Sequence, residues 1–210
     1  MKLESIREEV IRLVEDKSYD PISVDNLINL SLSACAHQVD IPELKSVFTV
    51  ATEPGIAYIA LAEKISNFGG RVKKIKCNGT SLKIYSTLDD MLTNYDGLTD
   101  SGDVEACCLE GRNLWYAKVP ETAVGLLILC YQNPEPLYAG NPEVSWMPEY
   151  CQRKILVGGA CSVIFDEKEE EDSGKPVTRR YDAMFNEGIK DLRAWVSKNR
   201  RNLTYSAWTE

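Results

Sequence analysis

The chain has 210 residues, of which 44% are hydrophobic and 27% are charged, a composition typical of one globular domain or two small ones. No stretch reaches the length of about 18 apolar residues that a membrane helix needs, and the N-terminus lacks the apolar core of a secretion signal, so we expect neither a membrane protein nor a secreted one. The 24 Lys and Arg residues stand against 32 Asp and Glu residues, and the resulting net charge of −8 disfavours a general nucleic-acid binder.

The first forty residues predict two helices. Apolar side chains recur at helical spacing in residues 3–14, and the pair Asp20-Pro21 breaks this pattern. Ser23 is the candidate N-cap of the second helix, which we expect to end near Gln38. This helix is apolar nearly all round, so we expect it to be buried.

Residues 45–137 predict an inserted β domain. Short apolar runs separated by turn residues indicate five or six strands with hairpin-like connections. Residues 123–131 are apolar on both faces, which is typical of a central strand. We therefore expect an antiparallel β-sandwich or a small barrel in this segment.

The clearest local prediction is a β hairpin around Asn78-Gly79, a dipeptide that favours a type I′ turn. In the resulting register one face is apolar, whereas Lys74, Lys76 and Lys83 form a basic stripe on the other face. No aromatic residues alternate with these lysines, as they do in many nucleic-acid-binding surfaces. We therefore expect the stripe to be solvated or to contact a protein.

The helical pattern returns after Pro148. Residues 150–165 predict a buried helix, with a β hairpin as the alternative. Residues 178–198 predict an amphipathic helix whose apolar side chains lie on one stripe.

Together these elements predict an α+β fold. Residues 1–44 and 146–199 would form a helical domain, a four-helix-type bundle built from both chain ends. Residues 45–137 would form the inserted β domain, and residues 200–210 an extended C-terminal tail.

Charged residues are segregated along the chain. Residues 64–83 contain six Lys or Arg and no acid, whereas residues 87–110 contain seven acids and no base. Residues 166–172 contain six acids and one lysine. Such charge blocks are typical of a protein that binds complementary surfaces, including those of other copies of itself. The alternative is that the charged residues lie on faces exposed only to solvent.

The residues supply no catalytic or metal-binding constellation. There is a single histidine, His37, and none of the seven cysteines forms a CxxC pair, so we expect no metal, no cofactor and reduced thiols. Glycine-rich phosphate-binding motifs are absent from the sequence. We expect no enzyme, and a cytosolic thiol enzyme that uses His37 with a cysteine is the remote alternative.

The C-terminal tail has the composition of a docking segment. Arginine and aromatic side chains are the types enriched at the anchors of protein interfaces, which favours docking on a partner over disorder. The residues concerned are Arg200, Arg201, Leu203, Tyr205 and Trp208.

Several local features, in their order along the chain, resemble the head–tail connector adaptor proteins of tailed bacteriophages, also called head-completion or tail-tube adaptor proteins. The features are the strand Asn113–Pro120 that ends in proline, the apolar strand 124–131 followed by Pro134-Glu135-Pro136, the segment Met147–Tyr150 that leads into the small-residue helix at 155–160, and the closing amphipathic helix from Tyr181 to Leu192.

This resemblance implies a structural virion protein at the head–tail interface, assembled in the host cytoplasm. The chain would form a twelve-fold ring that joins the capsid portal protein to a downstream tail or nozzle protein. The helical domain would form the ring wall, and residues 200–210 would dock on the portal. DNA would pass through the channel without sequence recognition. Another phage tail or capsid interaction module is the alternative.

A ring also needs two different surfaces that meet at each contact between subunits. The segregated charges predict candidate residues for both surfaces of this subunit interface. They are the bases Lys74, Lys76 and Lys83 and the acids Asp89 and Asp90.

Overall fold

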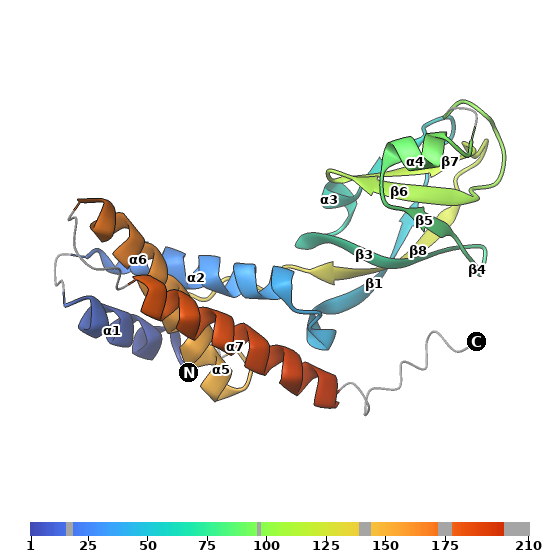
Figure 1. Ribbon diagram of the computed structural model, residues 1–210. Coiled ribbons are helices and arrows are strands. Elements are labelled where there is room, and N and C mark those ends of the chain that lie inside the picture. The colour runs from blue at the N-terminus through green and yellow to red at the C-terminus, as the bar shows by residue number, and fades with distance from the viewer. Residues whose placement is uncertain (16–18, 96–97, 139–143, 172–177, 200–210) are drawn as a thin grey trace. The chain divides into compact units, whose positions relative to one another are not determined.

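The structure, a computed structural model, describes residues 1–15, 19–95, 98–138, 144–171 and 178–199 (Figure 1). The chain divides into two compact units, one of residues 1–43 and 134–210 and the other of residues 44–133. Helices dominate the first unit and strands the second, so the fold mixes helix and sheet. None of the described helices is both long and apolar enough to cross a bilayer.

Four long helices account for most of the helical unit. They are α1 (Leu3–Val14), α2 (Pro21–Gln38), α6 (Gly158–Glu171) and α7 (Thr178–Asn199). Helix α6 packs against α7, α2 and α1, as Figure 1 shows. The short helix α5 (Glu149–Gln152) leads into α6 through the π-helical turn η2 (Arg153–Val157). The predicted helix at 150–165 is thus confirmed, and its β-hairpin alternative is wrong.

Helix α2 begins at Pro21, so the prediction that Ser23 caps this helix was wrong. The N-cap is Asp20, whose carboxylate accepts hydrogen bonds from the Ser23 backbone N–H at 3.1 Å and from the Ser23 hydroxyl at 3.2 Å. Proline is favourable at the first helical position, because its missing N–H would have no intrahelical partner there. The Asp20-Pro21 pair therefore starts a helix instead of only ending one.

Ion pairs join helices across the helical unit. The Arg7 guanidinium on α1 donates to both carboxylate oxygens of Asp25 on α2, at 2.7 and 2.6 Å. The Lys154 ammonium in η2 donates to Glu187 at 2.6 Å and to Asp191 at 2.8 Å, both on α7. These ion pairs favour one alignment of the neighbouring helices, because charge-assisted hydrogen bonds are directional. The apolar contacts between the same helices are less directional.

The β unit contains two separate four-stranded sheets. The first has the strand order β1-β8-β3-β4 and the second the order β2-β7-β6-β5. The strands are β1 (Lys45–Ala51), β2 (Tyr58–Ala60), β3 (Phe68–Cys77), β4 (Thr80–Ser81), β5 (Lys83–Tyr85), β6 (Ala106–Glu110), β7 (Asn113–Ala117) and β8 (Gly125–Gln132).

The two sheets do not close into a barrel, so of the two expected architectures the barrel is wrong. Buried side chains from both sheets form one core between them, with Ile75 and Ile128 from the first sheet and Leu114 and Tyr116 from the second. Strand β8 lies between β1 and β3, which confirms the prediction of a central strand.

The predicted hairpin is confirmed, but it ends early. Cys77 pairs with Thr80, and the Leu82 backbone N–H donates to the Ile75 carbonyl at 2.9 Å. The chain then crosses to the second sheet, where β5 pairs with β6 in parallel. The sequence had predicted antiparallel sheets, and the parallel pairing of β5 departs from this prediction. The reason is that β5 leaves its hairpin partner and joins a different sheet.

Helix α4 (Leu88–Leu92) forms a third layer of the β unit. Its Met91 side chain is fully buried against Ala106, Cys108 and Ala117, which lie on the face of the second sheet that points away from the first. The layers therefore follow in the order first sheet, second sheet, α4 (Figure 1). The helix ends at Leu92.

Gly188 on α7 offers a test of the packing between α7 and η2. A Cβ at this position would lie 2.7 Å from the Ile155 Cγ1 and 2.8 Å from the Lys154 Cβ. We expect Gly188→Ala to lower the free energy of unfolding by about 1–3 kcal/mol through overpacking, although alanine is the better helix former by about 1 kcal/mol. Urea unfolding measures the change.

The matched control is Asn186→Ala, at an exposed position of the same helix. It should keep or slightly raise the free energy of unfolding because alanine has the higher helix propensity. If Gly188→Ala stabilised the protein as well, the close approach of α7 to η2 would be refuted.

Candidate functional site

The outer face of the first sheet carries a set of basic side chains. Because paired residues in adjacent strands share a face, the register between β3 and β8 separates the two faces of the sheet. Ile75 pairs with Ile128, and both are buried in the core. Lys74 pairs with Leu129 and therefore lies on the opposite, outer face.

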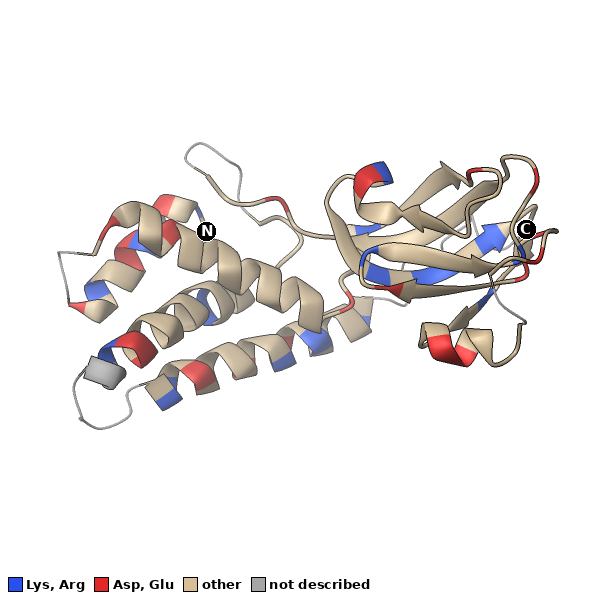
Figure 2. Ribbon diagram, turned by 90° about the horizontal axis from the view of Figure 1, so that it is seen from above, with Lys and Arg blue, Asp and Glu red and all other residues tan. Residues whose placement is uncertain are grey.

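Two more bases of β3 share this outer face. Arg71 pairs with Tyr131, and Lys76 pairs with Leu127. The four strands of this sheet together contain five Lys or Arg residues and no Asp or Glu, in a protein that has an excess of acids. Figure 2 shows the blue segments on these strands. We call this surface the basic sheet face.

Three cations surround one aromatic ring at the end of the basic sheet face. The Arg71 guanidinium carbon lies 4.3 Å from the centre of the Tyr131 ring, and the ammonium nitrogens of Lys45 and Lys73 lie 5.4 and 5.6 Å from it. Tyr131 is fully buried, so its ring faces these cations instead of water. Each such contact contributes roughly 0.5–1 kcal/mol where the cation remains solvated.

An irregularity in β3 brings Lys73 into this group. Val72 pairs with Cys130 and Lys74 with the next residue of β8, Leu129, so Lys73 is the additional residue of a β-bulge. Bulges redirect side chains that strict alternation would place on the other face. The predicted basic stripe had included Lys74 and Lys76 but not Lys45, Arg71 or Lys73, although Arg71 and Lys73 belong to the basic block of residues 64–83.

The centre of the basic sheet face is apolar. Val47 of β1, which pairs with Leu129, is 44% exposed, and Leu127 and Leu129 of β8 are half-buried. An apolar centre with charged side chains at one border is the arrangement found in protein–protein interfaces.

The opposite side of the β unit carries acids on helix α4. Asp89 and Asp90 are exposed, while Met91 of the same helix points into the protein. Asp90 accepts a hydrogen bond from the Ser86 hydroxyl at 2.7 Å, and its backbone N–H donates to the Thr87 hydroxyl at 3.1 Å. Hydrogen bonding of the Asp90 carboxylate by the Ser86 side chain, and to a smaller extent by the Thr87 side chain, lowers the pKa of the Asp90 carboxyl.

The structure does not place Lys83 with Lys74 and Lys76, as the predicted basic stripe required. Lys83 belongs to β5 of the second sheet and pairs there with Ala106, which lies in the core beneath α4. Its ammonium group donates to the Tyr85 hydroxyl at 2.8 Å. Lys83 therefore lies on the α4 side of the β unit, because the chain changes sheets directly before it.

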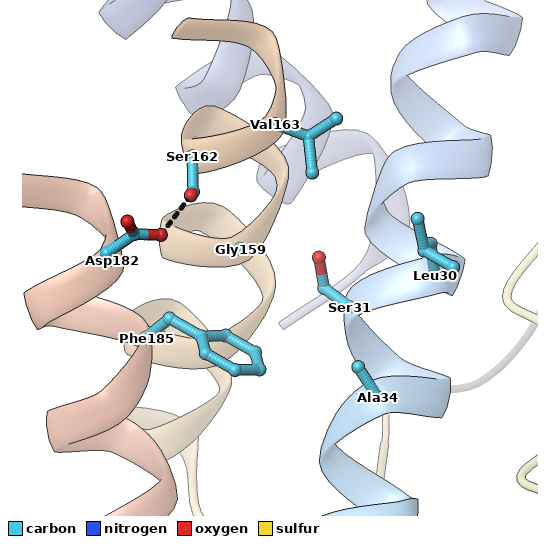
Figure 3. A pocket seen from close by; sticks show the side chains of 8 residues that line it. All are labelled: Leu30, Ser31, Ala34, Gly159, Ser162, Val163, Asp182 and Phe185. Carbon is cyan, nitrogen blue, oxygen red and sulfur yellow. Dashed lines mark hydrogen bonds between the residues drawn. The ribbon is translucent and has the colours of Figure 1, made fainter. Parts of the chain in front are cut away.

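The helical unit contains a groove of about 220 Å³ between α2, α6 and α7. In Figure 3, Leu30, Val163 and Phe185 border this space, and the Ser162 hydroxyl donates to the Asp182 carboxylate at one side. Gly159 forms part of the lining, where a Cβ would lie 2.8 Å from the Ser31 Cβ. The lining is mainly apolar, so the groove suits packing against a protein better than chemistry on a polar substrate.

The cysteines do not form a reactive site. All seven are buried and free, and burial raises the pKa of the Cys35, Cys107 and Cys161 thiols to about 12. A catalytic cysteine instead needs a lowered pKa and access to its substrate. The exposed His37 binds the Ser33 carbonyl oxygen through its Nδ1 at 2.8 Å. This arrangement argues against the thiol-enzyme alternative.

Two further predictions concern metals and the tail. Within the described ranges, no three or more His, Cys, Asp and Glu side chains are grouped so that they could hold a metal ion. The predicted docking segment lies outside the described residues. It comprises Arg200, Arg201, Leu203, Tyr205 and Trp208.

The apolar centre of the basic sheet face and the apolar groove of the helical unit suit contact with other proteins. Residues 1–208 match the family described as SU10 adaptor protein, so the chain belongs to this family. The match confirms the resemblance to phage head–tail adaptors, and it implies interaction with other head and tail proteins of a bacteriophage. A search of curated proteins finds no match to the chain.

Thiol accessibility can be measured directly. At pH 8 the native protein is expected to react with Ellman's reagent at fewer than one thiol per chain, because burial keeps the thiols protonated and covered. All seven cysteines should react after denaturation. One thiol that reacted fast and stoichiometrically in the native protein would contradict this assignment and restore the thiol-enzyme alternative.

The raised thiol pKa values also predict how stability depends on pH. An unfolded cysteine ionises near pH 8.5, whereas Cys35, Cys107 and Cys161 ionise in the folded protein only near pH 12. Their contribution is therefore complete below about pH 8.5 and is lost as the pH rises from there toward 12. Thermal unfolding at pH 7 to 10.5 should show a falling midpoint in this window, and a constant midpoint would contradict the burial of the thiols.

Proposed function

We propose that this protein is a ring-forming adaptor of the virion, which joins the capsid portal to the tail and gives passage to DNA. The observation that carries the proposal is the family match over residues 1–208, which covers nearly the whole chain. In this role the protein is structural and not catalytic. It acts at the head–tail interface of the virion after assembly in the host cytoplasm.

The charge distribution of the β unit supports assembly into a ring. A ring is built from one contact repeated between two different surfaces of each subunit. The β unit has such a pair, with Lys74 and Lys76 on the outer face of the first sheet and Asp89 and Asp90 on α4. Twelve subunits is the number that the family resemblance implies.

The C-terminal segment is the proposed portal contact. Arg200 and Arg201 can pair with acidic groups of the portal, and Tyr205 and Trp208 supply aromatic anchors, which dominate the binding energy of many interfaces. The segment directly follows α7, the longest described helix. A downstream tail or nozzle protein then contacts the β unit, and DNA passes through the channel without sequence recognition.

Removal of residues 200–210 tests the portal contact. We expect the truncated chain to keep its helical content, measured by circular dichroism, and to bind the purified portal protein of the same phage more weakly by at least the factor lost with Trp208 alone. The substitution Trp208→Ala should weaken binding by about 30-fold, equivalent to roughly 2 kcal/mol at an interface anchor. Binding is measured by biolayer interferometry.

The matched control is Thr204→Ala in the same segment, which removes a small polar side chain and should change the affinity less than threefold. Portal binding that is unaffected by the truncation would refute the tail as the contact. A full-length chain that does not bind the portal at all would favour the alternative, another phage tail or capsid interaction module.

A further inference from the structure

We propose that the basic sheet face of one copy binds the α4 side of the β unit of a second copy, in a head-to-tail contact. The proposal rests on the ring assembly proposed above and names the surfaces through which that assembly occurs. On one side the contact is made by Lys73, Lys74 and Lys76, and on the other by Asp89 and Asp90.

Charge complementarity is the first argument for this contact. The strands of the first sheet carry five bases and no acid, whereas helix α4 carries two exposed acids and no base. Opposite charges on two surfaces speed their encounter and disfavour contacts between like surfaces. Two basic sheet faces therefore repel each other, and so do two α4 sides, which leaves the head-to-tail pairing as the favoured one.

The positions of the two surfaces are the second argument. The basic sheet face and α4 are separated by the core between the sheets, by the second sheet and by the smaller core beneath α4. They therefore lie on opposite sides of one compact unit. Two complementary surfaces on opposite sides of one unit cannot contact each other within one copy. Between copies they generate a repeating assembly, which becomes a ring when the rotation closes.

The apolar centre of the basic sheet face favours a protein over DNA as its partner. Val47, Leu127 and Leu129 lie beside the lysines, and a phosphate backbone provides no surface that would bury them. On α4, Leu92 is 36% exposed next to the acids. An aliphatic side chain beside two carboxylates complements a surface with an apolar centre and a basic border.

Charge reversal on one face provides the test. We expect the full-length wild-type chain to form species larger than a dimer at low ionic strength in sedimentation velocity, and to dissociate as salt screens the contact. The variant Lys74→Glu/Lys76→Glu should associate at least tenfold more weakly. Lys83→Glu is the matched comparison, because Lys83 lies on the α4 side of the unit, where a further negative charge should maintain or strengthen association instead of weakening it.

Reversal on the other face should have the same effect. We expect Asp89→Lys/Asp90→Lys to be monomeric under these conditions. The variant Asp89→Asn/Asp90→Asn removes the negative charges without introducing positive ones, and it should self-associate more weakly than the wild-type chain. Thermal melts identify any variant that fails to fold. A mixture of the two charge-reversed variants should assemble again, because each retains one wild-type surface and the reversed surfaces complement each other.

Three outcomes would refute the proposed contact. The wild-type chain could stay monomeric up to its solubility limit, or Lys83→Glu could weaken association as much as Lys74→Glu/Lys76→Glu does. The third is that the mixture of the two charge-reversed variants remains monomeric. Loss of DNA binding in Lys74→Glu/Lys76→Glu, with self-association unchanged, would assign the face to DNA instead.

The contact and the adaptor role can fail independently. If self-association does not depend on these charges while the wild-type chain binds the portal through residues 200–210, only the contact proposed here is wrong. If charge reversal abolishes self-association but the wild-type chain does not bind the portal protein, the proposed contact between copies is supported and the adaptor role is wrong.

Discussion

The pairing of β1 with β8 is the constraint on which the β unit depends. These are the first and last strands of the unit, and their antiparallel register places Lys45 opposite Tyr131 and Ala51 opposite Gly125. The two ends of the β unit therefore lie side by side, where the chain enters after Glu43 and leaves at Pro134. A unit whose ends meet in this way can be inserted between two helical segments without a long connection.

Strand β8 also connects the core to the surface proposed for assembly. Its Leu126, Ile128 and Cys130 side chains are fully buried between the sheets. Its alternate residues Leu127 and Leu129 form the centre of the basic sheet face. Because a strand alternates its side chains between two faces, a one-residue slip of β8 would exchange these sets and disrupt both at once. The same register therefore underlies folding and the proposed contact.

The features that the sequence predicted well are local. Asn78 and Gly79 adopt the positive φ angles, 49° and 81°, that their turn requires, so the hairpin was predictable from two residues. Helical periodicity likewise located the long helices. The N-cap of α2 was assigned to Ser23 instead of Asp20 because both residues are good caps, and the choice depended on whether Pro21 ends one segment or starts the next.

The features that the sequence did not predict depend on contacts between distant segments. The gathering of Lys45, Arg71 and Lys73 around Tyr131 requires the registers of three strands and a bulge, none of which has a local signal. Lys83 was misplaced for a similar reason, since the chain leaves one sheet for the other immediately before it. The aromatic and basic composition of residues 200–210 was visible from the sequence, but the partner proposed for this segment belongs to another molecule.

Electron cryomicroscopy of the intact head–tail interface tests the account most directly. The account predicts a closed ring of this chain between portal and tail, with residues 200–210 of each subunit in contact with the portal and with DNA in the central channel. A structure of a complete virion in which this chain forms no ring, or lies away from the portal, would contradict it.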